Sequence, residues 1–199
     1  MILAFDTSSA ACTAALFEDG RCIARADEAI ERGHAERLVP MLAELLDGRR
    51  PDRILVGVGP GSFTGIRVAI AAAHGLAIGW DCAIGGMSSL ALLAAGAKGE
   101  VGVAVTGGHG ELFIQQFDAA LRPQSQLHNA TPGAAALLIS AQLIIGSGAA
   151  ALVAARGSGE AREGFPAAAN ALRLPEDLRS LPPKPIYARA PDARAKVAA

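Results

Sequence analysis

The stretch Gly59-Pro-Gly-Ser-Phe-Thr-Gly-Ile-Arg67 decides how the first half of the chain is interpreted, because it separates two apolar segments of different character. Residues 54–58 before it are short and rich in β-branched side chains, which predicts a buried strand. Residues 66–78 after it are rich in alanine, which predicts a helix. A glycine-rich turn between a strand and a helix lets the backbone approach a ligand or another chain, and the first helical N–H groups favour an anion.

This turn matches no common phosphate-binding pattern. A P-loop needs a lysine, which the stretch lacks, and the dinucleotide pattern needs a glycine where Thr64 stands. Ser62 and Thr64 are both suitable N-caps for the helix that follows. Two interpretations therefore stay open, a binding site and a tight turn that binds nothing. The candidate residues of the loop are Gly59, Gly61, Ser62, Thr64 and Gly65.

Composition limits the classes of function. The 199 residues suffice for one large domain or two small lobes, and 51% of them are hydrophobic while only 4% are aromatic, which predicts a core of small side chains. A net charge of −1 excludes a global basic field for nucleic acid. The three cysteines are scattered, which favours a reducing cytoplasm. The N-terminus has no basic segment, so we expect no signal peptide.

The order of predicted elements suggests two related halves. The first half reads β-β-β-α-β-α-β-α, with strands or helices at 2–5, 13–17, 22–26, 35–46, 54–58, 66–78, 83–84 and 88–95. Asp19-Gly20 is a hairpin turn between the second and third strands. The second half begins near residue 100, with elements at 101–105, 112–117, 132–139, 143–145 and 149–155. Both halves open with two strands joined by a turn, which indicates a duplicated architecture.

Residues 134–155 carry no charge, but Gly146-Ser-Gly148 interrupts them, so we predict separate elements there and no membrane span. The pattern assigns no fold to residues 157–183.

Few residues indicate chemistry. No two of the four histidines have the spacing of a helical ligand pair, so we predict no metal site. Ser62 follows its glycine directly and therefore does not match the nucleophile elbow of hydrolases. Asp6 ends an apolar strand just before Thr7 and Ser8. These three residues are weak nucleotide candidates through Mg²⁺ or phosphate, and hydrogen bonding to the turn is the commoner role of such an aspartate.

Four motifs occur in a recognisable order: Ile2–Ser8, His34–Met41, Gly59–Arg67 and Pro185–Arg189. Together they resemble the TsaB (YeaZ-like) family, most strongly over residues 1–95. The resemblance implies an α/β protein of the actin-like ATPase (sugar kinase/Hsp70/actin) fold, with two RNase-H-like lobes of mixed sheets flanked by helices. We expect one lobe at 1–99 and a smaller one at 100–199, whose final segment can pack back on the first.

The resemblance also implies a function. TsaB is the non-catalytic partner of TsaD, and with the ATPase TsaE the pair transfers a threonylcarbamoyl group to N6 of adenosine 37 in tRNAs that read ANN codons. On this basis ATP and a metal ion belong to the partner subunits, tRNA is contacted only through the complex, and the protein is cytoplasmic, with no membrane contact.

The chain departs from the motifs of its relatives at three places. Ser89 and Leu93 align with the two metal-ligand histidines of TsaD, and a leucine cannot coordinate metal. The phosphate motif Asp-x-Gly of the superfamily reads Asp6-Thr-Ser8, and the usual Asp-Ala-Arg of the second hairpin reads Thr106-Gly-Gly108. The alternative function is an independent ATP-dependent kinase or ATPase, suggested by Asp6, the glycine loop and residues 146–148. The lack of a nucleophile elbow and of paired histidines argues against a third possibility, a peptidase.

Members of the family dimerise, with themselves or with TsaD, through two helices of the first lobe, here about 35–46 and 65–79. The expected partner-interface residues are Leu38, Met41, Leu42, Leu45, Arg67, Ala69, Ala72, Ala73 and Leu76. The competing interpretation is that both apolar stripes face the sheet of this chain, since a helix on a sheet has one buried face.

Overall fold

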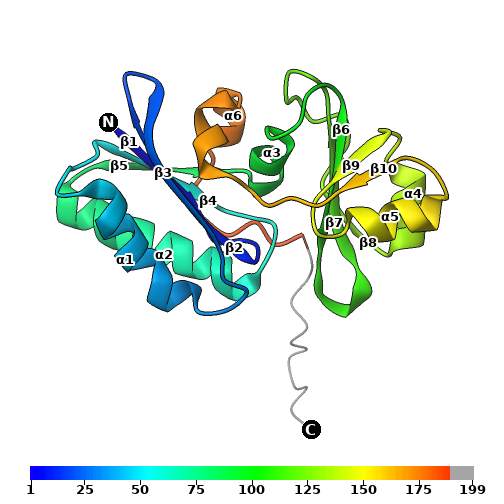
Figure 1. The fold of residues 1–199 in the computed structure, drawn as a ribbon, viewed down its shortest axis with the longest axis horizontal. Coiled ribbons are helices and arrows are strands. Elements are labelled where there is room, and N and C mark those ends of the chain that lie inside the picture. The colour runs from blue at the N-terminus through cyan, green and yellow to red at the C-terminus, as the bar shows by residue number, and fades with distance from the viewer. Residues whose placement is uncertain (189–199) are drawn as a thin grey trace, which may run out of the picture.

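A computed structural model describes residues 1–188 and shows two lobes, each built on a five-stranded mixed sheet (Figure 1). The first sheet has the order β3-β2-β1-β4-β5, from Arg21–Ala29, Ala11–Glu18, Ile2–Asp6, Arg53–Gly57 and Ala83–Met87. The second has the order β10-β9-β6-β7-β8, from Glu160–Arg162, Leu143–Ile145, Val101–Thr106, Leu112–Phe117 and His128–Ala130. Arg189, the last residue of the fourth sequence motif, lies outside the described residues.

The two sheets share one topology. In the first, β1 pairs antiparallel with β2 and parallel with β4, and β4 continues parallel to β5. In the second, β6 pairs antiparallel with β7 and parallel with β9, and β9 continues parallel to β10. The chain is therefore a duplicated RNase-H-like unit, which is the actin-like ATPase fold. β8 and β10 escaped prediction because each has only three residues and no apolar alternation.

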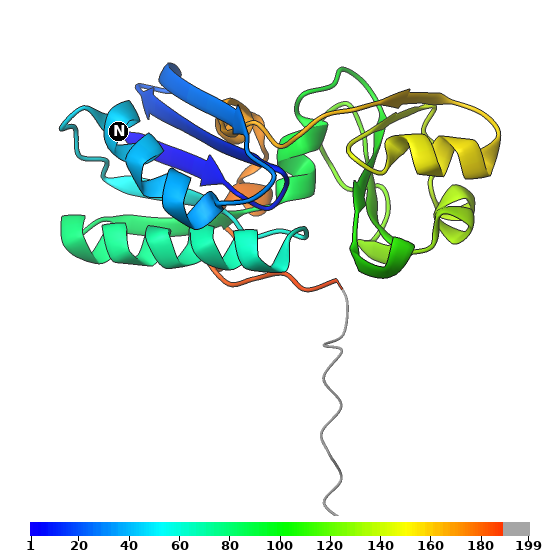
Figure 2. The ribbon, with the colours of Figure 1, turned by 60° about the horizontal axis from the view of Figure 1, so that its bottom comes forward.

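Two long helices cover the outer face of the first sheet (Figures 1 and 2). They are α1, His34–Leu46, and α2, Phe63–Trp80. The strands alternate as the pleat requires: Leu3 and Phe5 point to the helices, whereas Ala4 points to the opposite face. The hairpin turn occurs as predicted, with positive φ at Asp19 and Gly20.

The outer helices of the second lobe are shorter. They are α4, Pro132–Leu138, and α5, Ala149–Arg156, and they pack on a separate small core. A one-turn 3-10 helix, η1 (Gly108–Gly110), joins β6 to β7.

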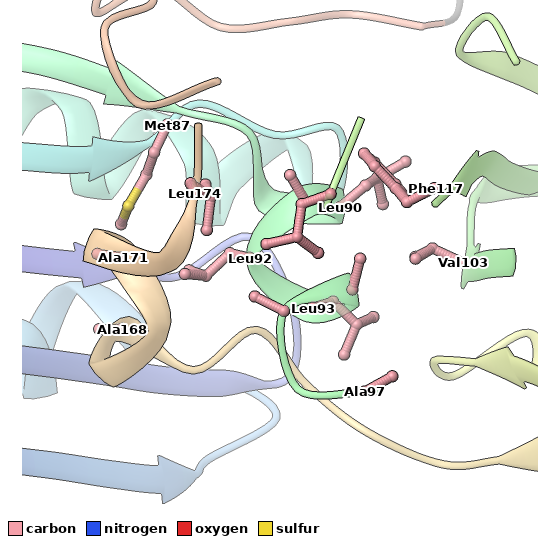
Figure 3. Close-up of a cluster of buried hydrophobic side chains, with 14 of the residues drawn as sticks. Met87, Leu90, Leu92, Leu93, Ala97, Val103, Phe117, Ala168, Ala171 and Leu174 are labelled. Carbon is pink, nitrogen blue, oxygen red and sulfur yellow. The ribbon is translucent and has the colours of Figure 1, made fainter. Parts of the chain in front are cut away.

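A single hydrophobic cluster joins the two lobes (Figure 3). Its centre is α3, Ser89–Ala94, in which all six residues are buried. Leu55 of the first sheet and Val103 and Phe117 of the second belong to the same cluster. The space between the lobes is therefore filled by core side chains.

The last part of the described chain returns to the first lobe. After β10, the 3-10 helix η2 (Ala168–Arg173) and the short helix α6 (Glu176–Arg179) pack beside the first sheet. Gly86 and Leu181 exchange two backbone hydrogen bonds of 2.7 and 2.9 Å, and the Ala168 amide donates to Thr13 Oγ1 over 2.8 Å. We call residues 163–188 the strap. The boundary near residue 99 stays a prediction.

Candidate functional site

Asp6, a predicted nucleotide candidate, has hydrogen-bond partners on both of its carboxylate oxygens. Oδ1 accepts from the amide and the hydroxyl of Ser8, both at 2.7 Å, and Oδ2 accepts from Ser89 Oγ at 2.5 Å. Ser89 Oγ in turn accepts from the Gly59 amide over 3.0 Å. Burial raises the pKa of the Asp6 carboxyl, and the hydrogen bonds from Ser89 and Ser8 oppose that rise. The network ties β1, the glycine loop and α3 together.

The glycine loop lies against the turn that follows β1. A Cβ at Gly61 would lie 2.2 Å from the Ser8 carbonyl oxygen, and one at Gly65 would lie 1.9 Å from that of Thr7. The Ser62 amide donates to the Ser8 carbonyl over 2.7 Å, and Thr7 Oγ1 donates to the Gly65 carbonyl over 2.7 Å. Glycine is therefore required so that two backbone segments can meet, and the close approach is made to this chain itself.

Ser62 is the N-cap of α2, because its hydroxyl accepts from the Gly65 amide over 3.2 Å. Thr64, the other predicted cap, lies in the first turn of the helix and lines a pocket. The pocket has a volume of about 500 Å³ and lies between the N-terminal ends of α1 and α2. Its charged lining residues are two acidic, Glu31 and Glu36, and one basic, Arg32, and His34 Nε2 is 2.9 Å from the Ser9 carbonyl oxygen.

The corresponding place in the second lobe carries no such network. Thr106 ends β6 where Asp6 ends β1, and its side chain is exposed. Ser147 of the Gly146-Ser-Gly148 turn accepts from the Thr106 amide over 3.0 Å. This turn, like the glycine loop, binds its own lobe.

The structure corrects most of the expected partner-interface residues. Six of them are buried in the core of this chain, at 0 to 8% exposure, because they form the inner faces of α1 and α2: Leu38, Met41, Leu42, Leu45, Ala69 and Ala73. Ala72 and Leu76 are half-buried and also contact this core, and Arg67 is exposed. The apolar pattern marks the faces of α1 and α2 that the sheet of this chain buries, and the use of these helices by a partner stays a prediction.

The surface of α2 that faces away from the sheet is largely apolar, contains two glycines and also carries the exposed His74. Ala71, Gly75, Ile78 and Gly79 are exposed, Ile78 at 83%. We call these four residues the outer face of α2. By length and composition α2 could cross a membrane, but it covers the sheet, and 28% of the helix is buried. A buried face and an apolar exposed face together explain this composition.

The positions that align with the TsaD metal ligands have other roles. Ser89 anchors the glycine loop, and Leu93 lies in the core between the lobes with 4% exposure. Among residues 1–188, no group of three or more His, Cys, Asp or Glu side chains is placed to hold a metal ion.

Known proteins resemble this chain over much of its length. The family model for TsaD, tRNA N6-adenosine threonylcarbamoyltransferase, matches residues 27–166. The TsaB protein of Escherichia coli K12 is 40% identical over 101 residues, which are 48% of this chain and 43% of that protein. This match therefore spans less than half of the length of the relative. An uncharacterised Mycobacterium bovis protein is 31% identical over 97% of this chain and 93% of its own length.

A solved structure, YeaZ from Pseudomonas aeruginosa, superposes with a TM-score of 0.79 and 29% identity, covering 94% of this chain and 98% of that one. It has nearly the same length and the same two-lobed fold. Sequence motifs, duplicated topology and these matches agree that the chain belongs to the TsaB/YeaZ family, within the wider group that the threonylcarbamoyltransferase model describes.

Proposed function

We propose that this protein acts in tRNA threonylcarbamoyladenosine biosynthesis as a non-catalytic subunit that binds a TsaD protein through the outer face of α2. The biosynthetic role is supported by the name of the E. coli relative and by the matching family model. A non-catalytic role is supported by Ser89 and Leu93, which stand where the catalytic relative has ligands and which serve loop and core here.

The observation that carries the proposal is the composition of the outer face of α2. A glycine inside a helix costs about 1 kcal/mol relative to alanine. A Cβ added at Gly75 or Gly79 would meet nothing within 4 Å, so packing within the described chain gives no reason for either glycine. The close approach of a second helix would explain both glycines, because the missing side chains let two backbones come together. The exposed Ile78 then supplies apolar area at the centre of the contact.

The experiment compares two exposed apolar residues, one on each lobe. Ile78 on α2 and Leu137 on α4 are 83% and 89% exposed, so neither substitution should disturb folding. Ile78→Asp should weaken binding to the TsaD of the same organism by roughly 30-fold or more, the loss expected at a central interface residue. Leu137→Asp should leave binding unchanged. Calorimetry with the two purified proteins measures both.

The functional arm is a reconstitution of tRNA modification with and without this chain. Product formation should require the chain, and Ile78→Asp should lower it in parallel with binding. Activity that persists when the chain is omitted, together with no complex at micromolar concentration, would contradict the proposal. In the absence of TsaD the same face should support a weak homodimer. The Ile78→Asp substitution should abolish this dimer, and analytical sedimentation measures the loss.

A further inference from the structure

Arg67 is held in a fixed position beside two aromatic side chains at the N-terminal end of α2. Its guanidinium carbon lies 3.5 Å from the centroid of the Phe63 ring and 5.7 Å from that of Tyr187. Its Nε donates to the Tyr187 hydroxyl over 3.0 Å, and the two rings are 5.7 Å apart. We call these three residues the arginine cluster. Stacking and one hydrogen bond remove most of the freedom that an exposed arginine would otherwise have.

The strap builds this cluster from the far end of the sequence. The Ile186 amide donates to the Val58 carbonyl over 2.8 Å, and the Ile186 carbonyl lies beside Gly59. Tyr187 is thereby placed next to the first turns of α2, 120 residues from Arg67 in sequence. Two segments are therefore brought together to orient one exposed cation.

The remaining donors of Arg67 face no acceptor within residues 1–188. Only Nε has a hydrogen-bond partner there, so the two Nη groups stay available on an exposed side chain. A planar guanidinium with two free Nη groups matches a carboxylate or a phosphate. Phe63 and Tyr187 are themselves 56% and 47% exposed, so the cluster is open to a partner surface.

We infer that the arginine cluster receives a carboxylate of the TsaD-like subunit and fixes the register of the docking helices. This inference rests on the proposed function. Arginine and tyrosine dominate the energetics of protein interfaces, especially where their geometry is already set before binding. The apolar outer face of α2 continues along the same helix, so one contact supplies both area and a specific ion pair.

A protein carboxylate is favoured over the phosphates of RNA by the surroundings of Arg67. Binding to a nucleic acid backbone uses several lysines and arginines together. Within Phe63–Trp80 the only other titratable residue is His74, and the whole chain has a net charge of −1. A single oriented cation beside an apolar surface suits one acidic side chain of a protein.

The test measures the affinity of the full chain for the TsaD of the same organism with four variants. Arg67→Gln removes the cation, and Arg67→Lys keeps the charge but loses the fork and the stacking. Both should weaken binding roughly tenfold or more, as expected for an interface arginine. Tyr187→Phe keeps the ring and loses the hydroxyl, and a smaller loss of a few-fold is expected. Arg25→Gln, on the exposed edge strand β3, is the matched control and should change nothing.

A double-mutant cycle identifies the acceptor. Each Asp or Glu on the docking helices of TsaD is neutralised in turn and combined with Arg67→Gln. One of them should lose its effect in the Arg67→Gln background, and the salt dependence of binding should become shallower in that variant.

The outcomes separate the two proposals. If the wild-type chain does not bind TsaD, the proposed function fails and this inference fails with it. If the wild type binds and the Arg67 and Tyr187 variants bind equally well, only the inference is overturned. If Arg67→Gln leaves TsaD binding intact but weakens binding of tRNA to the isolated chain, the cluster is a phosphate contact and the inference is likewise overturned.

Discussion

The two lobes share one sheet topology but differ in the length of their outer helices and in the side chain that ends the first strand of each. The outer helices of the first lobe have 13 and 18 residues, and those of the second have 7 and 8. The first lobe has a buried carboxylate that is linked to its glycine loop through Ser89, whereas the second has an exposed threonine at the same place. Each turn contains glycines that approach their own lobe closely.

This difference shows what each lobe contributes. The duplicated sheet supplies a platform in both, but only the first carries helices long enough to present an extended surface. The carboxylate network of Asp6 holds the start of α2 against the sheet, so that the outer face and the arginine cluster stay in a fixed orientation. The second lobe mainly supplies one side of the shared core.

The largest expected effect tests whether the lobes are energetically separate. Leu90 is 1% exposed in the cluster that joins them. Leu90→Ala should lower the free energy of unfolding by about 3 kcal/mol, because it removes buried methyl groups and leaves a cavity. Urea unfolding should stay a single transition, with circular dichroism and the fluorescence of Trp80 coinciding.

Leu137→Ala on the exposed side of α4 is the control and should change stability by less than about 0.5 kcal/mol. Two separate transitions in the wild type would show that the lobes unfold independently, against the shared core.

An effect of similar size is expected when the glycines at the starts of α2 and α5 are compared. An alanine at Gly65 would meet the Thr7 carbonyl, which is backbone and cannot move without shifting β1. At Gly148 the nearest obstacle, at 2.6 Å, is the end of the Leu112 side chain, which can rotate. We expect losses of about 3 kcal/mol for Gly65→Ala and about 1 kcal/mol for Gly148→Ala, the range for overpacking. Equal losses in thermal and urea unfolding would remove the distinction between the two turns.

The smallest effect concerns the pH dependence of the first lobe. Burial raises the pKa of Asp6 above its ordinary value, so the folded state keeps this proton to higher pH than the unfolded state does. The contribution of Asp6 to stability is therefore largest in acid and declines as pH rises through the window between the two pKa values. The difference in unfolding free energy between wild type and Asp6→Asn should fall across that window and then level off.

The carboxylates whose pKa values are lowered, Glu28, Asp52 and Glu176, occur in both proteins and cancel in this difference. Thr106→Asn, at the equivalent place in the second lobe, should follow the wild type at every pH. A difference between wild type and Asp6→Asn that rises with pH would mean that the hydrogen bonds of Ser8 and Ser89 outweigh burial.

The sequence was sufficient for the elements with clear periodicity or turn chemistry. The hairpin at Asp19-Gly20, the helices of the first lobe and the strand–turn–helix at residues 143–156 were all predicted. The helices of the strap, η2 and α6, were not, because they are short and the hydrogen bonds of the strap join residues far apart in sequence. Such pairings have no local pattern.

The site was predicted less well than the fold, for a physical reason. Leu38 and Ala69 were expected at a partner surface because apolar periodicity marks a buried face, and periodicity cannot say what buries it. In this chain the sheet does. The exposed glycines of α2 weaken the helix without serving its own packing, which is why the proposed partner surface is placed there. The contact of Tyr187 with Arg67 had no signal in the sequence.

The return of the strap has a consequence for biosynthesis on the ribosome. The first sheet is synthesised early, but Thr13 Oγ1, the backbone of Gly86 and the Val58 carbonyl also form hydrogen bonds with residues 168, 181 and 186, which are synthesised much later. The packing of the strap on the first lobe is thus delayed until these later residues have left the exit tunnel. Arg67 receives its tyrosine last, so that a nascent or prematurely terminated chain would lack the oriented cation.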